Sequence, residues 1–264
     1  MAAPNLPWPE FLNLAKSLNC IGIEFRNDLP VDLFDGASPD VVGAEAKVAG
    51  LRILALAEIK AFNNWSDVKA VEAKALILIA KACGAEKVSL IARNDNKSIP
   101  AAESKANLET ALRELKPLLE QNDLVGLIEP LGFETSDLRD KAEVVEAIEA
   151  LGARDRFCIV HDTFHHYAAG GDAIFPEYTG IVHISGVVKP KLNATDLRDG
   201  YRVLVDEHDI IGSVNQLASL VDAGYEGPVS FEPFASKVLM PADASEALEK
   251  SFLYIEKCMQ ERSS

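Results

Sequence analysis

The sequence is short of several features that would place the protein in particular classes. It holds only four cysteines in 264 residues, and they lie far apart. Neither a disulfide framework nor a zinc ribbon of close cysteine pairs is therefore indicated. No stretch approaches the roughly 18 apolar residues of a membrane span. The opening MAAPNLPWPE also lacks the basic start and apolar core of a signal peptide. These absences predict a cytoplasmic protein with no membrane partner.

Positive charge is scarce as well. Lysine and arginine together number 26 against 41 acidic residues, which gives a formal net charge of −15. Phosphate backbones are bound by clustered basic side chains, so this composition argues against a nucleic-acid partner. Hydrophobic residues make up 48% and charged residues 25%, an ordinary globular composition. Because no linker or low-complexity segment interrupts the chain, residues 1–264 are expected to form one domain.

Short runs rich in β-branched residues alternate with longer stretches of helical periodicity. The expected strands are 20–26, 51–58, 87–93, 124–130, 157–162, 181–187 and 228–234. The expected helices are 8–18, 39–49, 67–84, 101–120, 140–152, 213–223 and 242–260. This alternation predicts parallel strands joined by crossover helices, and the strongly apolar strands predict a sheet that is covered on both faces.

The number of strands decides between two α/β folds. Seven strands are clear in the sequence, whereas a closed (β/α)8 TIM barrel needs eight. The helix at 8–18 should follow the first strand, which leaves only residues 1–5 to supply it. We therefore expect a TIM barrel whose first strand is very short or truncated, with an irregular N-terminal segment. A doubly wound open sheet is the alternative.

Histidine is the last scarce residue, and its placement is informative. All five histidines fall between residues 160 and 209, and three of them surround one aspartate in FCIVHDTFHHY. In parallel α/β folds the active site gathers at the carboxyl ends of the strands. Four successive expected strands carry a metal-binding side chain at or near that end: Glu129, Asp162, His183 and Glu232. Alternation along each strand directs these side chains to a common interior.

Bringing three carboxylates together is costly unless something neutralises them. At separations of about 5 Å each pair repels by roughly 3 kcal/mol at an effective dielectric near 20. Three pairs amount to about 10 kcal/mol, comparable with the stability of a whole domain. Such a cluster must be protonated, paired with cations or occupied by a metal. Oxygen ligands with one imidazole suit one divalent ion such as Mn²⁺, Mg²⁺, Co²⁺ or Zn²⁺, and the sequence does not choose among them.

The chain resembles the xylose isomerase-like TIM-barrel family of sugar isomerases and epimerases. The motifs that carry the resemblance run through most of the chain: GIEFRNDLP, LIEPLGFE, VHDTFHHY, VHISGV and GYEGPVSFEPF. Within that family it is most similar to inosose (keto-inositol) isomerase-like proteins of inositol catabolism. The resemblance implies that Glu129, Asp162, His183 and Glu232 are metal ligands.

The resemblance also implies a reaction. It is the isomerisation or epimerisation of a keto-polyol, an inosose or a ketose, through an enediolate, with Glu129 and Glu232 exchanging the proton as acid and base. It further implies that His165 and Arg202 bind substrate oxygens. A hydroxypyruvate isomerase-like enzyme and a non-catalytic sugar-binding barrel are the alternatives. An apurinic endonuclease would need histidines on earlier strands, which this chain lacks. A homo-oligomer is compatible with all of these.

Other polar residues also lie near the expected site. His161 alternates to the opposite face from Asp162, so it is expected to pack structurally. His166 either lines the pocket or faces solvent. Glu24 and Arg26, in the strand GIEFR, either pair with each other or point into the mouth of the barrel.

Overall fold

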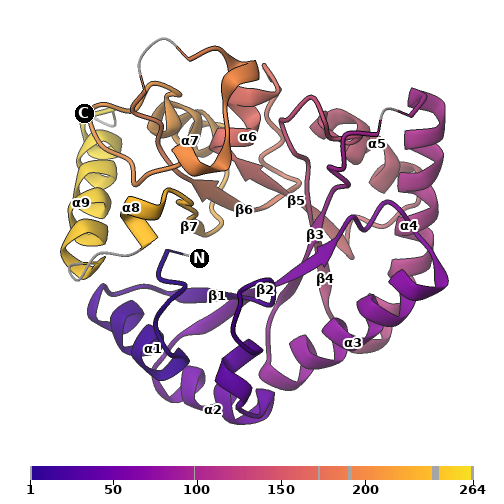
Figure 1. Ribbon diagram of the computed structural model, residues 1–264, viewed down its shortest axis with the longest axis horizontal. Helices are drawn as coiled ribbons and strands as arrows, with labels where there is room; N and C mark the ends of the chain where they lie inside the picture. The colour runs from indigo at the N-terminus through magenta and orange to yellow at the C-terminus, as the bar shows by residue number, and fades with distance from the viewer. Residues whose placement is uncertain (1, 98, 172, 190–191, 240–243, 263–264) are drawn as a thin grey trace.

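Parallel strands form the centre of the fold. The computed structural model describes residues 2–97, 99–171, 173–189, 192–239 and 244–262. Its strands are β1 (Gly22–Arg26), β2 (Arg52–Lys60), β3 (Lys87–Ile91), β4 (Val125–Glu129), β5 (Phe157–Asp162), β6 (Thr179–Ile184) and β7 (Val229–Phe231). They are hydrogen-bonded in sequence order from β1 to β7, and every pair is parallel. The sheet curves into a nearly closed ring (Figure 1).

Helices surround this ring on the outside (Figure 1). They are α1 (Trp8–Ser17), α2 (Pro39–Val48), α3 (Asp67–Cys83), α4 (Ala101–Asn122), α5 (Lys141–Ala150), α6 (Thr163–Ala168), α7 (Ser213–Asp222), α8 (Ser236–Leu239) and α9 (Ala244–Arg262). Short 3₁₀ turns lie at Leu33–Gly36, Ala194–Asp196 and Asp199–Tyr201. Among the helices of the described residues, none combines the length and the apolar character that crossing a membrane requires.

The expected TIM-barrel architecture is confirmed with seven parallel strands in the described residues, and each expected strand and long helix is present with its ends shifted by a few residues. The start of the last expected helix, 242–243, lies outside the described residues, and α9 is seen from Ala244. Sequence periodicity does not predict α6, because a helix of six residues is too short to show a hydrophobic period.

Local sequence accounts for the helix ends. In α3, the Ser66 side chain accepts a hydrogen bond from the backbone N–H of Lys69, which caps the first turn. The same helix stops at Gly84, whose φ of 72° lies in the left-handed region that glycine adopts without strain. Asp140 caps α5 in the same way as Ser66, by accepting from Ala142.

Two apolar layers hold the barrel together and leave one end of it polar. Outside the strands, buried side chains pack between sheet and helices. Inside the ring a smaller apolar cluster fills the barrel: Leu54, Ala55, Leu127, Val160 and Ile181. Buried polar side chains then follow along the strands toward their carboxyl ends, where the candidate site lies.

The first strand is the point at which the barrel departs from a complete ring. Residues 2–7 contain no strand, so α1 is the first regular element of the described chain. In the described part of the chain β7 is paired only with β6, and β1 only with β2. In the described residues the ring is therefore open between β7 and β1, and the expected irregular N-terminal segment takes the place of a regular first strand.

Candidate metal centre and active site

Four buried side chains meet at the carboxyl ends of neighbouring strands. Glu129 ends β4, Asp162 ends β5, His183 lies one residue before the end of β6, and Glu232 directly follows β7. The sheet register sets Asp162 beside His183, and His183 beside Ser230, two residues before Glu232. One ligand atom from each of the four lies within 4.8 Å of every other. The structure thus brings together all four residues that the sequence singles out as metal ligands.

Arg202 is the principal positive charge in this cluster. Its Nη2 atom lies 2.5 Å from an oxygen of Asp162 and 2.5 Å from an oxygen of Glu232. The guanidinium lies over the rings of Phe164 and Phe234, and the side chain is only 1% exposed. Arg202 therefore neutralises part of the buried negative charge in the metal-free protein, in contact with two of the candidate ligands.

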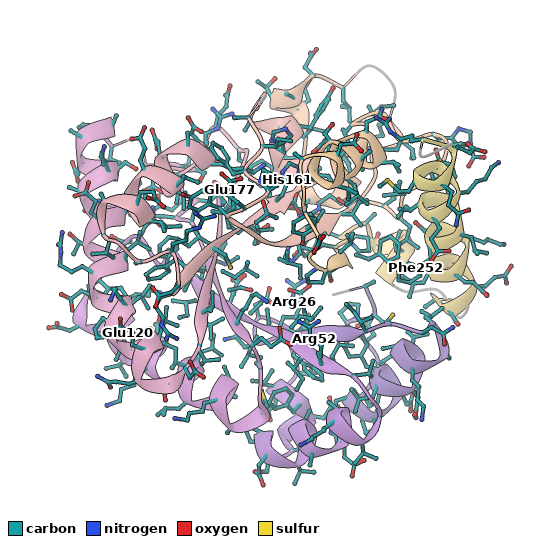
Figure 2. All side chains as sticks on the ribbon, turned by 180° about the vertical axis from the view of Figure 1, so that it is seen from behind. Arg26, Arg52, Glu120, His161, Glu177 and Phe252 are labelled. Carbon is teal, nitrogen blue, oxygen red and sulfur yellow. The ribbon has the colours of Figure 1, made fainter. Side chains whose placement is uncertain are left out.

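His183 is held from one side by an acidic residue that sequence reasoning did not assign. Its Nε2 atom lies 3.2 Å from an Oε of Glu24, and both side chains are completely buried. Glu24 does not pair with Arg26, which instead binds Asp28 at 2.5 Å. A carboxylate that orients a histidine from behind is the usual partner of a metal-bound imidazole. One signal in the sequence pointed to this role of Glu24. It lies two residues before Arg26 on β1 and therefore shares its strand face, and Arg26 lies inside the ring (Figure 2).

The other ring nitrogen of His183 supports a cation site. Nδ1 is buried, makes no well-aligned hydrogen bond, and lies 3.3 Å from Glu232 and 3.8 Å from Glu129. A buried polar atom without a partner is costly unless a ligand satisfies it. Three carboxylates and one imidazole are a donor set that divalent ions accept. The residues present therefore fit one divalent metal ion.

Charges within the cluster perturb the pKa values strongly. Burial, followed by the neighbouring Glu232 carboxylate, raises the pKa of Glu129 to about 8. Burial opposes a charge on His183, but the carboxylates of Glu232 and Glu24 outweigh it and hold its pKa well above the ordinary value. Burial likewise opposes ionisation of Glu232, yet His183 and Arg202 keep the pKa of that carboxyl well below its usual range. The metal-free site therefore stores protons that a bound cation would displace.

We expect metal affinity to depend on pH for this reason. Below about pH 8, where Glu129 is protonated in the metal-free protein, binding must release a proton. As the pH is lowered, the apparent metal affinity should then fall by up to about tenfold per pH unit for each proton displaced. As the pH is raised, the contribution of Glu129 should level off once its carboxyl is ionised. His183, whose pKa is also raised, adds to the same trend. Isothermal titration with Mn²⁺ in buffers of different ionisation enthalpy measures the protons released, and an affinity independent of pH would contradict the expectation.

A second prediction concerns Glu24. Replacing it by glutamine removes the charge behind His183 and should weaken metal binding about 10- to 100-fold, the usual effect of losing such a partner. Glu86→Gln is the matched control. Glu86 forms a 2.6 Å ion pair with Arg52 and belongs to no part of the cluster. Metal titration of both variants checks this, and equal affinities would show that Glu24 does not orient the imidazole.

His165 lies beside the cluster with one ring nitrogen engaged. Its Nδ1 accepts a hydrogen bond from the backbone N–H of Gly132, so Nε2 carries the proton. That Nε2 lies 4.0 Å from Glu129. Burial is the largest influence on His165 and lowers its pKa, which favours the neutral ring. A neutral N–H donor is thus directed toward the space beside Glu129, as a substrate-binding role requires.

The other two histidines of the motif belong to a separate buried network. His161 is completely buried on the outer face of β5, and Lys141 Nζ lies 3.0 Å from its Nδ1 and 2.9 Å from Nδ1 of His166. Gln216 contacts Nε2 of His161 at 3.1 Å. Burial lowers the pKa of Lys141 to about 7. His161 is thus structural, as its alternation predicts, and His166 joins the same network rather than the metal cluster.

The fold and the cluster define a TIM-barrel protein with a buried carboxylate and imidazole centre at the carboxyl ends of its strands. The sequence profile of the family described as xylose isomerase-like TIM barrel matches residues 12–258. The chain belongs to this family. Among curated proteins, none matches the chain in sequence.

Solved structures show the same architecture over nearly the whole chain. A xylose isomerase domain-containing protein from Salmonella typhimurium LT2 has 27% sequence identity and a TM-score of 0.88, covering 98% of this chain and 94% of its own. The IolI protein with a bound zinc atom has 20% identity and a TM-score of 0.85, covering 97% and 94%. D-psicose 3-epimerase from Clostridium cellulolyticum H10 has 15% identity and a TM-score of 0.71, also covering 97% and 94%. At such low identity the last two establish the fold alone.

Proposed function

We propose that the protein is a divalent-metal-dependent isomerase or epimerase of an uncharged keto-polyol, an inosose or a ketose. The observation that carries the proposal is the convergence of Glu129, Asp162, His183 and Glu232 within 4.8 Å. Such a cluster is expensive to build without a cation to bind. It lies where TIM-barrel enzymes hold their active sites.

The charges at the site favour an uncharged substrate. The ionised carboxylates of Glu129, Asp162, Glu232 and Glu24 and the Arg202 guanidinium sum to −3, and a divalent ion leaves the cluster at −1. Arg26, the next arginine along the barrel mouth, is already paired with Asp28. Because neither arginine is free of carboxylates, no strong attraction for a phosphate or carboxylate group arises from them. A neutral polyol or cyclitol fits this balance.

In the proposed mechanism the two glutamates have opposite roles in proton transfer. Glu129 and Glu232 approach the same nitrogen of His183 from different strands, at 3.8 and 3.3 Å. One would remove the proton next to the substrate carbonyl and the other would return it, with an enediolate between the two steps. A bound divalent ion would polarise the carbonyl and adjacent hydroxyl oxygens and so stabilise that enediolate. Glu129 and Glu232 are each only 4% exposed, so bulk water has little access to either carboxylate to compete for the proton.

His165 and Arg202 would orient the substrate. The Nε2 proton of His165 is directed into the space beside Glu129 and can donate to a substrate oxygen. Arg202 already contacts Asp162 and Glu232 through Nη2, and its Nη1 lies 3.4 Å from Asp199. It can therefore bind a substrate oxygen only beside these carboxylates. If His165 and Arg202 each hold one substrate oxygen, only one substrate hydrogen comes within reach of the glutamate that acts as the base.

The names of the similar structures suggest where to look for the substrate. One of them binds zinc, and another is a D-psicose 3-epimerase. We propose that this chain acts on the same chemical class, and a cytoplasmic enzyme of inositol catabolism is the more specific form of that proposal.

Solvent proton exchange tests the function whichever product the reaction forms. The protein, loaded in turn with Mn²⁺, Mg²⁺, Co²⁺ or Zn²⁺, is incubated in D₂O with a panel of inososes, ketoses and hydroxypyruvate. Deuterium next to the carbonyl of a keto-polyol, together with one ion per chain by metal analysis, is the expected result. Exchange confined to hydroxypyruvate would redirect the assignment to that substrate. A chain that binds no metal and exchanges nothing would be a non-catalytic barrel.

A further inference from the structure

The outer faces of α2 and α3 carry a concentration of exposed apolar side chains. Of the eleven large hydrophobic residues that are exposed in the described part of the chain, five lie on these two helices: Val41, Val48, Val68, Val71 and Leu78. The two helices hold only 10 and 17 residues of the 264. They contact each other on the outside of the ring (Figure 1). Exposed hydrophobics gathered in this way mark an interaction surface, which we call the α2–α3 face.

α3 is apolar on both of its sides. One side packs into the barrel through residues that include Leu76, Ile77 and Ala80. The other side exposes a row of five residues, here called the apolar stripe: Val68, Val71, Ala75, Leu78 and Ala82. Their spacing alternates three and four residues, which is the pattern by which one helix packs along another. Because a helix that is apolar all round is normally buried, a second helix is the partner that fits this stripe.

The apolar stripe is complementary to a second copy of itself. If two copies of α3 pack antiparallel about a two-fold axis at Ala75, Val71 of each copy meets Leu78 of the other. Val68 then meets the small Ala82, and the two Ala75 side chains allow the helices to approach closely at the axis. A two-fold interface requires a patch that is self-complementary in this way.

Charged residues beside the stripe favour the antiparallel orientation. Asp67 and Lys81 directly precede the first and last residues of the stripe, so they lie on the same flank, and both are exposed. Antiparallel packing places Asp67 of each copy near Lys81 of the other, whereas parallel packing would place Asp67 near Glu72. Lys74 lies on the same flank near the axis, where its long aliphatic stem can carry the charge out to solvent.

The α2–α3 face is neutral, although the whole chain has a formal charge of −15. The acidic residues and lysines of the two helices are equal in number: Asp40, Glu45, Asp67 and Glu72 against Lys47, Lys69, Lys74 and Lys81. Two acidic molecules can therefore meet through this face without strong local repulsion.

The size of the face sets the expected strength of association. A helix of 17 residues is about 25 Å long at 1.5 Å per residue, and a neighbouring helix about 10 Å away widens the face to about 20 Å. The resulting area of about 500 Å² per copy, or about 1,000 Å² in total, is at the lower end for a specific interface. A dissociation constant in the micromolar range is therefore expected.

We infer that the α2–α3 face is the surface through which two copies of this chain associate, with α3 antiparallel to α3 of the second copy about Ala75. The face lies on the outside of the barrel, whereas the carboxylate cluster lies inside the ring. The inference therefore does not rest on the proposed function, and it can fail or succeed independently of it.

Sedimentation equilibrium of the full chain tests the association. As the concentration rises through the micromolar range, the average mass should increase from that of one chain toward that of two. Val71→Asp should raise the dissociation constant about a hundredfold, because two substituted residues enter each interface and each costs about tenfold. Leu78→Lys should act similarly, since it buries the opposite charge in the same apolar contact. A chain that stays monomeric throughout this range would overturn the inference.

A matched variant on another helix locates the interface. Leu253 is 59% exposed in the middle of α9, comparable with Val71 at 70% and Leu78 at 50%. Leu253→Asp should leave the dissociation constant unchanged, and circular dichroism checks that all three variants are folded. A dimer that survives the Val71 and Leu78 substitutions, or that the Leu253 substitution weakens equally, would place the interface elsewhere and overturn the inference.

Exchanging the flanking charges tests the orientation. Asp67→Lys and Lys81→Asp should each weaken self-association about threefold to tenfold, because like charges then face each other twice in the interface. Mixing these two variants should restore association, since each lysine then meets an aspartate of the other chain. A mixture that associates no better than either variant alone would overturn the antiparallel arrangement.

Discussion

Glu232→Gln should abolish turnover and weaken metal binding together. Glutamine keeps the shape of the side chain, but it can neither accept a proton as a base nor offer a charged oxygen to a cation. Loss of general acid–base catalysis alone lowers rates by about 10²- to 10⁴-fold. The added loss of one of three carboxylates at the cluster should lower metal affinity as well. The measurement is deuterium exchange under saturating metal, alongside a metal titration of the same variant.

Glu177→Gln is the control for this variant. Glu177 is exposed and precedes β6, at the opposite end of that strand from His183, so the same change of charge there should leave both rate and affinity unchanged. Normal turnover by the Glu232 variant on a substrate that the native protein converts would refute the proposed role. Reduced metal affinity with a normal rate at saturating metal would leave Glu232 as a ligand but not as a base.

The second large effect is expected at Arg202. Arg202→Met leaves Asp162 and Glu232 without their 2.5 Å partner in an almost fully buried site. Removing one partner of a buried ion pair typically costs about 3–5 kcal/mol of unfolding free energy. In the metal-free protein we expect a loss of this size in chemical denaturation. Because a divalent ion supplies positive charge to the same carboxylates, added Mn²⁺ should restore part of the stability, more than it adds to the native protein.

An exposed ion pair provides the comparison. Arg52→Met removes the 2.6 Å pair with Glu86, in which the arginine side chain is 52% exposed. Pairs of this kind contribute roughly 0–1 kcal/mol. A similar loss of stability in both variants, or no rescue of the Arg202 variant by metal, would show that the guanidinium and the cation do not share the role of neutralising Asp162 and Glu232.

Much of the architecture follows from local sequence because each unit of the barrel is local. A strand such as 125–129 is a run of apolar residues ending in an acid, and the helix that follows begins at a capping aspartate. Alternation within each strand then separates His161 from Asp162, which is enough to predict that one packs outward and the other faces the interior.

Other features depend on residues that are distant in sequence and become neighbours only when the ring curves. Glu24 and His183 are 159 residues apart and 3.2 Å apart in space. The sequence left two options for Glu24, and neither was a histidine of β6. The network of Lys141 with His161 and His166 is similar, because helical and strand periodicity place each residue on a face but do not state which faces meet.

The sequence by itself determined the order of strands and helices, and which four side chains stand at the carboxyl ends of successive strands, since these depend on periodicities of two and about 3.6 residues along the chain. The tertiary structure alone decided that Arg202 bridges two of those side chains and that Glu24 supports a third. The reason is geometric: the curvature of the sheet brings together side chains from strands that are distant in sequence, and no local pattern encodes which atoms then meet.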